Sequence, residues 1–214
     1  MTGPPVAPVL KVSGLSFGYP QQPALFTDWS TRVPPGITLV RGGESKGKTT
    51  LLRLLAGDLK AHAGQIQVNG IALGGQAQAY LRQVFWTDPR SDAFNQINAL
   101  DYLASLRARY PAFEQQAVES LLDGLSLTEH QLKPLHMLST GSRRKVWLAA
   151  AFASGAALTL LDDPFAALDK ASIGFVMDRL KNEAAKRNAA RAWLIADYAA
   201  PGPVPLAAVI DLGN

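Results

Sequence analysis

The chain has 214 residues, of which 48% are hydrophobic, so it can bury a sizeable core as one domain or as one domain with a subdomain. Because it contains no cysteine, disulfides, thiol catalysis and thiolate metal sites are excluded, and the composition fits a reducing compartment. No apolar stretch reaches the roughly 18 to 20 residues that span a bilayer, and the net charge of +4 comes without a long basic run that would indicate nucleic-acid binding. We expect a soluble protein of the cytoplasm.

Short strands and turns are predicted for the start of the chain. Residues 1–8 contain three prolines and indicate a loose leader. Apolar segments at 9–12 and 15–19 predict two short strands, and turns follow at 20–23 and 33–36, where prolines cluster.

Residues 42–50 fit the pattern G-x-x-x-x-G-K-T of a phosphate-binding loop. An apolar run at 37–40 predicts a buried strand before the loop, and residues 50–56 predict a helix after it, ended by Gly57. The candidate nucleotide-binding residues of this loop are Gly42, Gly43, Glu44, Ser45, Lys46, Gly47, Lys48, Thr49 and Thr50.

The chemistry of phosphate binding explains these residue types. Glycines let consecutive backbone N–H groups turn inward around an anion, and the helix N-terminus adds a partial positive charge. Lys48 can then reach the terminal phosphates, and the Thr49 hydroxyl can ligate Mg²⁺. The alternative is a glycine-rich turn before an ordinary helix, which the strand-loop-helix context disfavours. We predict that the chain binds a nucleoside triphosphate.

The middle of the chain changes from strand patterns to helix patterns. Alternating apolar and polar residues at 64–70 predict a strand with one buried face, and residues 84–86 predict a second short strand. Leucines recur at helical spacing from residue 98 to about 127, with Pro111 separating two helical segments. We interpret this stretch as a helical insert.

The last third alternates between helices and apolar strands. Residues 142–153 and 171–187 predict helices, while residues 157–161, 192–196 and 207–212 predict strands. Strands that alternate with helices indicate an α/β fold with a largely parallel sheet and helices on its faces.

Asp162 and Asp163 stand directly after the strand at 157–161, followed by Pro164. Carboxylates at the end of a buried strand are costly unless they are paired or bind a metal. In combination with a phosphate loop, Asp162 is a candidate Mg²⁺ ligand beside Thr49. The alternative is a strand-end aspartate that caps the turn before the proline.

Residues 158–169, Leu-Thr-Leu-Leu-Asp-Asp-Pro-Phe-Ala-Ala-Leu-Asp, resemble the LLLLDEPFAALD segment of ABC-type ATPases. Residues 138–142, Leu-Ser-Thr-Gly-Ser, occupy the place of the LSGGQ signature of that family. Tyr19 resembles the aromatic residue that stacks on adenine. The resemblance covers essentially the whole chain.

The resemblance implies one ABC ATP-binding domain over residues 1–214. Its fold would be a P-loop NTPase core with a mainly parallel sheet and an N-terminal antiparallel β part, formed by residues 1–86 and 138–214. A helical subdomain would occupy about 87–137. The implied ligands are ATP and Mg²⁺.

The resemblance also implies partners. Two such domains would face head to tail around two ATP molecules, each ATP lying under the other subunit's signature residues, here Ser139, Thr140, Gly141 and Ser142. A separate integral membrane permease would hold the pair at the inner face of the membrane, and no direct contact with nucleic acid is expected. Ala93, Phe94 and Trp86 could dock the permease, although Trp86 is equally compatible with a core position.

Three positions that carry hydrolysis in the family differ here. Asp163 replaces the usual catalytic glutamate, and a group that retreats by about 1 Å can lose on the order of a hundredfold in rate. Thr87 stands where a glutamine is usual and remains only a weak metal-site candidate. Asp197 stands at the position of the switch histidine, where it would repel the γ-phosphate unless it points away. We therefore expect an ATPase with slow or impaired hydrolysis.

Four departures lie in the binding motifs themselves: Ser45 replaces a common glycine and Lys46 a small residue of the phosphate loop, and Thr140 and Ser142 alter the signature. The alternative function is a soluble ABC-type ATPase that acts on nucleic acid or ribosomes without transport. A small-molecule kinase with the same phosphate loop is a third reading, which explains neither the signature nor the 162–169 segment. A homodimer and a heterodimer with a more complete subunit both remain open, as do the substrate and the direction of transport.

Overall fold

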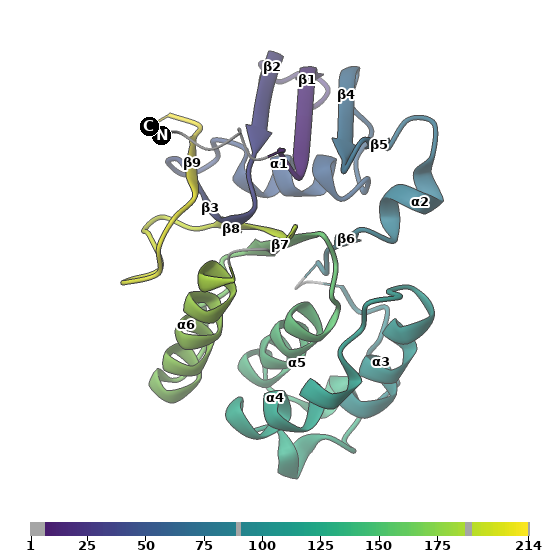
Figure 1. Cartoon of the computed structure of the whole chain (residues 1–214), viewed down its shortest axis with the longest axis vertical. Coiled ribbons are helices and arrows are strands. Elements are labelled where there is room, and N and C mark those ends of the chain that lie inside the picture. The colour runs from purple at the N-terminus through teal and green to yellow at the C-terminus, as the bar shows by residue number, and fades with distance from the viewer. Residues whose placement is uncertain (1–6, 89–90, 187–189, 214) are drawn as a thin grey trace.

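The computed structural model describes residues 7–88, 91–186 and 190–213. Figure 1 shows an antiparallel sheet above helix α1, a parallel sheet below that helix, and the remaining helices mostly on the far side of the parallel sheet. Most of the predicted leader, residues 1–6, lies outside the described residues, as does residue 187 at the end of a predicted helix.

The parallel sheet has the strand order β6-β7-β8-β3-β9, and every neighbouring pair is parallel. Its strands are β3 Gly36–Arg41, β6 Val84–Phe85, β7 Leu158–Asp162, β8 Ala192–Ala196 and β9 Ala208–Asp211. The predicted α/β fold and all five of these strands are confirmed. Because the strands run the same way, their carboxyl ends meet at one edge of the sheet, which is where ligands bind in folds of this kind.

Each face of the parallel sheet is covered by its own hydrophobic core. Along β8, Trp193 and Ile195 belong to the core that contains α5, while Leu194 and Ala196 belong to the core that contains α1. A strand that is buried on both faces needs apolar residues at every position. This explains why β8 appears in the sequence as a continuous apolar run, and why β7 is apolar except for the buried Thr159 and the final Asp162.

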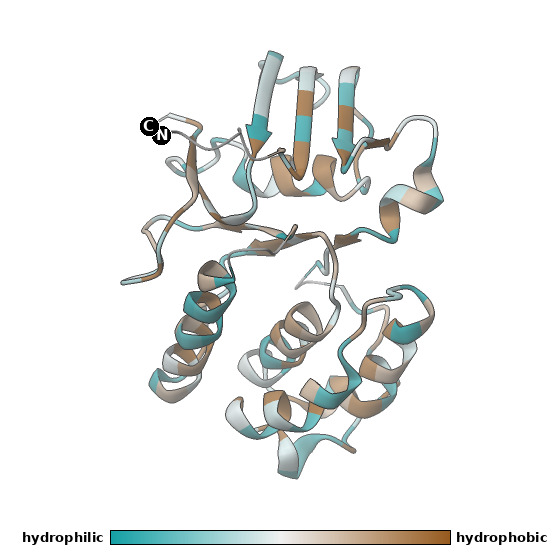
Figure 2. Cartoon of the chain, in the orientation of Figure 1, coloured by the Kyte–Doolittle hydropathy of each residue, from teal (hydrophilic) through white to brown (hydrophobic). Residues whose placement is uncertain are grey.

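The antiparallel sheet has the order β2-β1-β4-β5, with β1 Leu10–Phe17, β2 Phe26–Val33, β4 Ala63–Val68 and β5 Ile71–Ala72. Figure 2 shows alternating hydrophobic and hydrophilic bands along β1 and β4. The predicted one-faced strand at 64–70 corresponds to β4.

Two details of this sheet differ from the prediction. The two strands expected at 9–12 and 15–19 are one strand, β1, whose pairing shifts register around Gly14, where φ is 62°. Strand β2 was not predicted, because only its end residues, Phe26 and Val33, are buried and the polar positions between them hide the pattern.

The helices are α1 Lys48–Leu55, α2 Ala77–Leu81, α3 Ala99–Ser105, α4 Val118–Gly124, α5 Thr140–Ala153 and α6 Lys170–Ala185. Between α3 and α5 the chain adds 3-10 turns at Leu106–Ala108, Gln115–Ala117, Thr128–His130 and Leu135–Met137. The predicted helical insert is therefore confirmed as helical, and the subdomain limits at 87 and 137 stay a prediction. Across the described parts of the chain, none of these helices is long and apolar enough to cross a bilayer.

Two tyrosines attach the insert to the rest of the molecule. The Tyr110 hydroxyl donates to the carbonyl oxygen of Val84 in β6 at 3.0 Å. Tyr102, from α3, packs its ring edge-on against Trp147 of α5 at 4.8 Å between centroids. These contacts fix the insert against β6 and α5.

Candidate nucleotide-binding site

The phosphate loop connects the carboxyl end of β3 to the first turn of α1. Gly47 is the N-cap of α1 and has a φ of 89°, a left-handed conformation that glycine adopts without steric cost. Ser45 is also left-handed, with a φ of 59°, at the position where the family commonly has glycine. The backbone of the loop thus keeps a glycine-type turn even though a serine occupies it.

The phosphate lysine is folded back onto its own loop. Lys48 Nζ donates to the carbonyl oxygens of Gly42 at 2.6 Å and Gly43 at 3.0 Å. The Tyr198 ring covers the same ammonium, with its centroid 4.2 Å from Nζ. Glu44 and Lys46 are exposed beside Ser45 at the tip of the loop.

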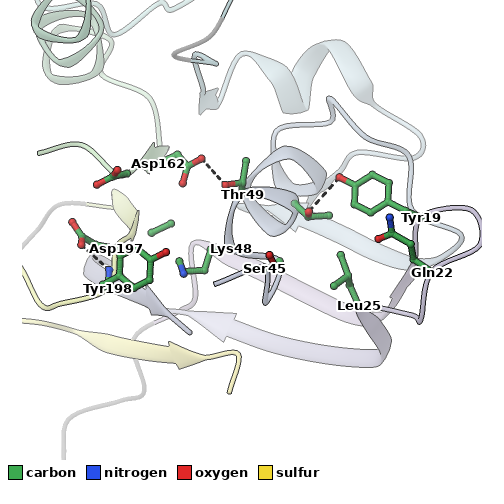
Figure 3. A pocket seen from close by; sticks show the side chains of 13 residues that line it. Tyr19, Gln22, Leu25, Ser45, Lys48, Thr49, Asp162, Asp197 and Tyr198 are labelled. Carbon is green, nitrogen blue, oxygen red and sulfur yellow. Dashed lines mark hydrogen bonds between the residues drawn. The ribbon is translucent and has the colours of Figure 1, made fainter. Parts of the chain in front are cut away.

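Thr49 and Asp162 meet beside Lys48, as Figure 3 shows. The Thr49 hydroxyl donates to Asp162 Oδ2 at 2.7 Å. A hydroxyl and a carboxylate are oxygen ligands of the kind that Mg²⁺ takes, together with waters and substrate phosphates. The described residues hold no cluster of three or more histidine, cysteine or acidic side chains that could bind a metal by itself. The pair fits a magnesium site that only a bound nucleotide completes.

A cavity of about 440 Å³ extends from this pair to Tyr19. Its lining residues are Tyr19, Gln22, Leu25, Ser45, Gly47, Lys48, Thr49, Thr50, Asp162, Asp163, Ala196, Asp197 and Tyr198. The Tyr19 hydroxyl lies 3.3 Å from Thr50 Oγ1, and its ring meets the ring of Phe17 edge-on at 5.1 Å. The structure therefore brings together nine of the eighteen predicted site residues, from four separate segments of the chain.

Four lining residues were not predicted: Gln22, Leu25, Ala196 and Tyr198. Gln22 and Leu25 follow Tyr19 in a turn, and their residue types carry no signal of their own. Tyr198 lies one position after Asp197, at the carboxyl end of β8, so its place in the chain was the signal that could have identified it.

Asp197 points into its own turn. Its Oδ1 accepts from the backbone N–H of Tyr198 at 2.6 Å and of Ala199 at 3.4 Å, and Figure 3 shows the first of these bonds. These bonds hold the carboxylate oxygen in a short capping turn. The expected repulsion of a terminal phosphate is thereby reduced, and no neutral donor takes the histidine's place at residue 197.

Asp163 lines the cavity with an exposed side chain and a left-handed backbone, with a φ of 46°. Its carbonyl oxygen accepts from Arg144 of α5. Aspartate tolerates this backbone conformation better than most residues do. The position is that of the predicted catalytic carboxylate, and its catalytic role stays a prediction.

Thr87 lies outside the main cavity. Its hydroxyl is 3.2 Å from the Tyr102 hydroxyl, and burial raises the pKa of Tyr102 to about 12. With Asp162 and Arg144 it lines a neighbouring cavity of about 30 Å³. The structure thus places Thr87 near the magnesium candidate residues but hydrogen-bonded toward the helical insert.

The signature residues form the N-terminus of α5. The Ser139 hydroxyl is the N-cap, accepting from the Ser142 N–H at 3.1 Å, and Thr140 is exposed beside it. Gly141 lies against the backbone of the 162–169 segment, since an added Cβ would come within 2.5 Å of the Ala167 carbonyl oxygen. Among the described residues that line the main cavity, none comes from the signature.

Comparison with known proteins identifies the same family as the sequence motifs. The ABC transporter family model matches residues 26–166. The "Cytochrome c biogenesis ATP-binding export protein CcmA" of Pseudomonas savastanoi pv. phaseolicola is 34% identical over 163 residues, covering 76% of each chain. The protein of that name from Pseudomonas aeruginosa is 36% identical over 148 residues, covering 68% of this chain and 73% of its own.

Solved structures share the fold. One, described as the ATP-binding subunit of an ABC transporter, superposes with a TM-score of 0.78 at 24% identity over 88% of this chain and 79% of its own. An ABC transporter ATP-binding protein from Pyrococcus furiosus superposes with a TM-score of 0.73 at 22% identity, and the match covers 95% of this chain and 96% of that protein. The predicted family and activity are confirmed: this chain belongs to the ABC transporter family, as an ATP-binding subunit with ATPase activity.

Proposed function

We propose that this subunit binds ATP with Mg²⁺ in the 440 Å³ cavity and drives a membrane permease through an ATP-dependent dimer. The observation that carries the proposal is the 2.7 Å contact between Thr49 and Asp162 next to Lys48. A hydroxyl, a carboxylate and the Lys48 ammonium therefore lie together at the N-terminus of α1. This is the combination that a magnesium-bound triphosphate requires.

The cavity supports one orientation of the nucleotide. Lys48 lies where α1 begins, and Tyr19 lies at the other end of the cavity (Figure 3). We propose that the phosphates bind beside Lys48 and that the base lies against Tyr19. Thr49 and Asp162 would hold Mg²⁺, which when bound neutralises part of the charge on the terminal phosphates.

The position of the signature supports a dimer. The N-terminus of α5 carries its Ser139 cap outside the cavity of its own chain. A helix N-terminus of this kind offers backbone donors to an anion. We propose that it addresses the ATP bound to a second ABC subunit, so that each site is completed in trans. Whether that subunit is another copy or a more complete relative is decided by co-purification from cells.

Three residues at the positions that carry hydrolysis in the family support slow hydrolysis in this chain. Asp163 is one methylene shorter than glutamate, Asp197 is held in its own turn, and the Thr87 hydroxyl faces Tyr102. Each change removes or shortens a group that would position water or stabilise the γ-phosphate in the transition state.

Relatives named as cytochrome c biogenesis export proteins support a role in export. We propose that the subunit works at the inner face of the membrane, attached through the permease. Deleting its gene and measuring covalently bound haem c would test this role, with plasmid copies of the wild type and of Lys48→Ala as the controls. A haem c content that stays at the wild-type level after deletion would contradict the cytochrome role but not nucleotide binding.

Nucleotide binding and hydrolysis are tested on the purified protein. Calorimetric titration should show ATP binding that is strengthened by Mg²⁺ and lost in Lys48→Ala, while Leu132→Ala, an exposed residue remote from the cavity, retains it. Steady-state turnover should fall below the ordinary range of about 1 to 1000 per second and should rise in Asp163→Glu. Wild-type turnover within that range would contradict the proposal of slow hydrolysis.

A further inference from the structure

Tyr198 occupies the phosphate end of the cavity although no motif contains it. The ring lies over Lys48 Nζ at 4.2 Å, and the side chain is 64% exposed. In Figure 3 the Tyr198 ring stands between Asp197 and Lys48.

The turn that carries Tyr198 is fixed by hydrogen bonds of Asp197. Asp197 donates its N–H to the Val40 carbonyl oxygen at 3.2 Å, which anchors the turn to β3 directly before the phosphate loop. The Asp197 carboxylate then accepts from the N–H groups of Tyr198 and Ala199. The residue at the histidine position therefore serves to place the ring beside Lys48.

Lys48 is engaged on three sides. An ammonium has three N–H donors. The carbonyl oxygens of Gly42 and Gly43 take two of them, and the face of the Tyr198 ring lies within the range of a cation–π contact. Phosphate oxygens need this same ammonium, so nucleotide and ring compete for it.

We propose that Tyr198 is a lid on the phosphate lysine, which the terminal phosphates of an incoming nucleotide must displace. This inference rests on the proposed nucleotide site and adds a residue that sets its affinity. Because the side chain is largely exposed, little buried area holds it in place and it can swing into solvent. A phosphate carries full negative charge whereas the ring offers only its quadrupole. Lys48 therefore binds a phosphate more strongly than it binds the ring.

The lid raises the apparent dissociation constant, which equals the intrinsic constant divided by the fraction of molecules in which Lys48 is uncovered. An exposed cation–π contact changes an equilibrium about two- to fivefold. The same factor is expected in the dissociation constant of any nucleotide whose phosphates reach Lys48. AMP, which has no terminal phosphates, should bind equally well with or without the lid.

Calorimetric titration of purified Tyr198→Leu and Tyr198→Phe tests the lid. The leucine variant keeps an apolar side chain but loses the ring, so its dissociation constant for ATP should fall about two- to fivefold while that for AMP stays constant. The phenylalanine variant keeps the ring and should retain the weaker affinity of the wild type. Weaker or unchanged ATP binding in Tyr198→Leu would overturn the proposal, as would tighter binding in Tyr198→Phe, which would assign the effect to the hydroxyl.

A second measurement needs no nucleotide. In a double-mutant cycle with Lys48→Met and Tyr198→Leu, urea unfolding of the nucleotide-free protein should reveal a coupling of about two- to fivefold in the unfolding equilibrium. Additive effects would show that the ring does not hold the lysine. If wild type binds no nucleotide, the proposed function fails, and the cycle still decides the lid contact.

Discussion

Thr49 donates a 2.7 Å hydrogen bond to Asp162 although 113 positions separate them in the sequence. The fold closes this distance because Thr49 lies in the first turn of α1 after β3, Asp162 ends β7, and β8 lies between these two parallel strands. Their meeting at the carboxyl edge brings together the two oxygen ligands that we propose for magnesium.

Asp162→Asn should remove the magnesium dependence of ATP binding. Asparagine keeps the shape of the side chain but loses its charge, so ATP affinity with Mg²⁺ should drop about 10- to 100-fold, while affinity in EDTA should change little. Titration with and without Mg²⁺ measures both values. Asp178→Asn, on the exposed side of α6, is the control, and an equal loss in EDTA would assign Asp162 a purely structural role.

The limits of sequence-based prediction can be traced to particular residues. The strands β3, β7 and β8 were predicted because burial on both faces makes their sequences mostly apolar, with one buried threonine each in β3 and β7. The phosphate loop was predicted because its chemistry dictates glycine, lysine and threonine at fixed spacing. Strand β2 escaped prediction because its interior is exposed.

Contacts between distant side chains were harder to foresee. Tyr198 approaches Lys48 only because β3 and β8 are neighbours, and the capping bonds of Asp197 depend on the turn after β8. The sequence placed Asp197 at a strand end but carried no information on where its carboxylate points.

Gly141→Ala should destabilise the protein although the change is one methyl group. The added Cβ would meet the carbonyl oxygen of Ala167 at 2.5 Å, and that residue already has a left-handed φ of 59°. We expect a loss of about 1 to 3 kcal/mol, the usual range for overpacking.

Gly174→Ala is the matched control for this substitution. Gly174 is exposed within α6, and an added Cβ there meets nothing within 4 Å. Alanine should stabilise the helix by about 0.5 to 1 kcal/mol. Urea denaturation measures both variants, and opposite signs are expected. Unaltered stability in Gly141→Ala would mean that the 162–169 segment moves aside freely.

Asp169 should make the protein sensitive to acid. The hydrogen bond from Lys145, followed by those from the N–H and hydroxyl of Ser172, holds the pKa of the Asp169 carboxyl far below its usual range. A carboxyl with a lowered pKa in the folded state contributes stability above its unfolded pKa of about 3.9, and this contribution disappears as the pH falls further.

The urea midpoint should therefore decline below about pH 4, and this decline should be smaller in Asp169→Asn, which lacks the titrating group. At neutral pH the variant should be less stable than wild type, because Lys145 and the start of α6 lose their partner. Asp178→Asn should keep the wild-type slope. If the urea midpoint of Asp169→Asn declined with pH as steeply as that of the wild type, other groups would control the acid response.

Arg191 should matter far more to stability than a surface cation. It is largely buried, its Nε donates to the Ala156 carbonyl oxygen at 2.9 Å, and burial lowers the pKa of its guanidinium. It lies 3.6 Å from the buried carboxylate of Glu183 and 3.7 Å from Glu114 at the edge of the helical insert. Removing the cation leaves the buried Glu183 with Lys186 as its one ion-pair partner among the residues that the structure describes.

We expect Arg191→Met to cost about 3 kcal/mol in urea unfolding, since the buried Glu183 carboxylate then loses one of its two cations and a larger part of its desolvation penalty is left uncompensated. Lys181→Met, which breaks an exposed pair with Asp178 on α6, should change stability by about 0.5 kcal/mol or less. Adding Glu183→Leu to Arg191→Met should recover part of the loss, because the stranded carboxylate is then gone. Strict additivity of the two substitutions would mean that Arg191 stabilises the junction through packing on Trp193 rather than through charge.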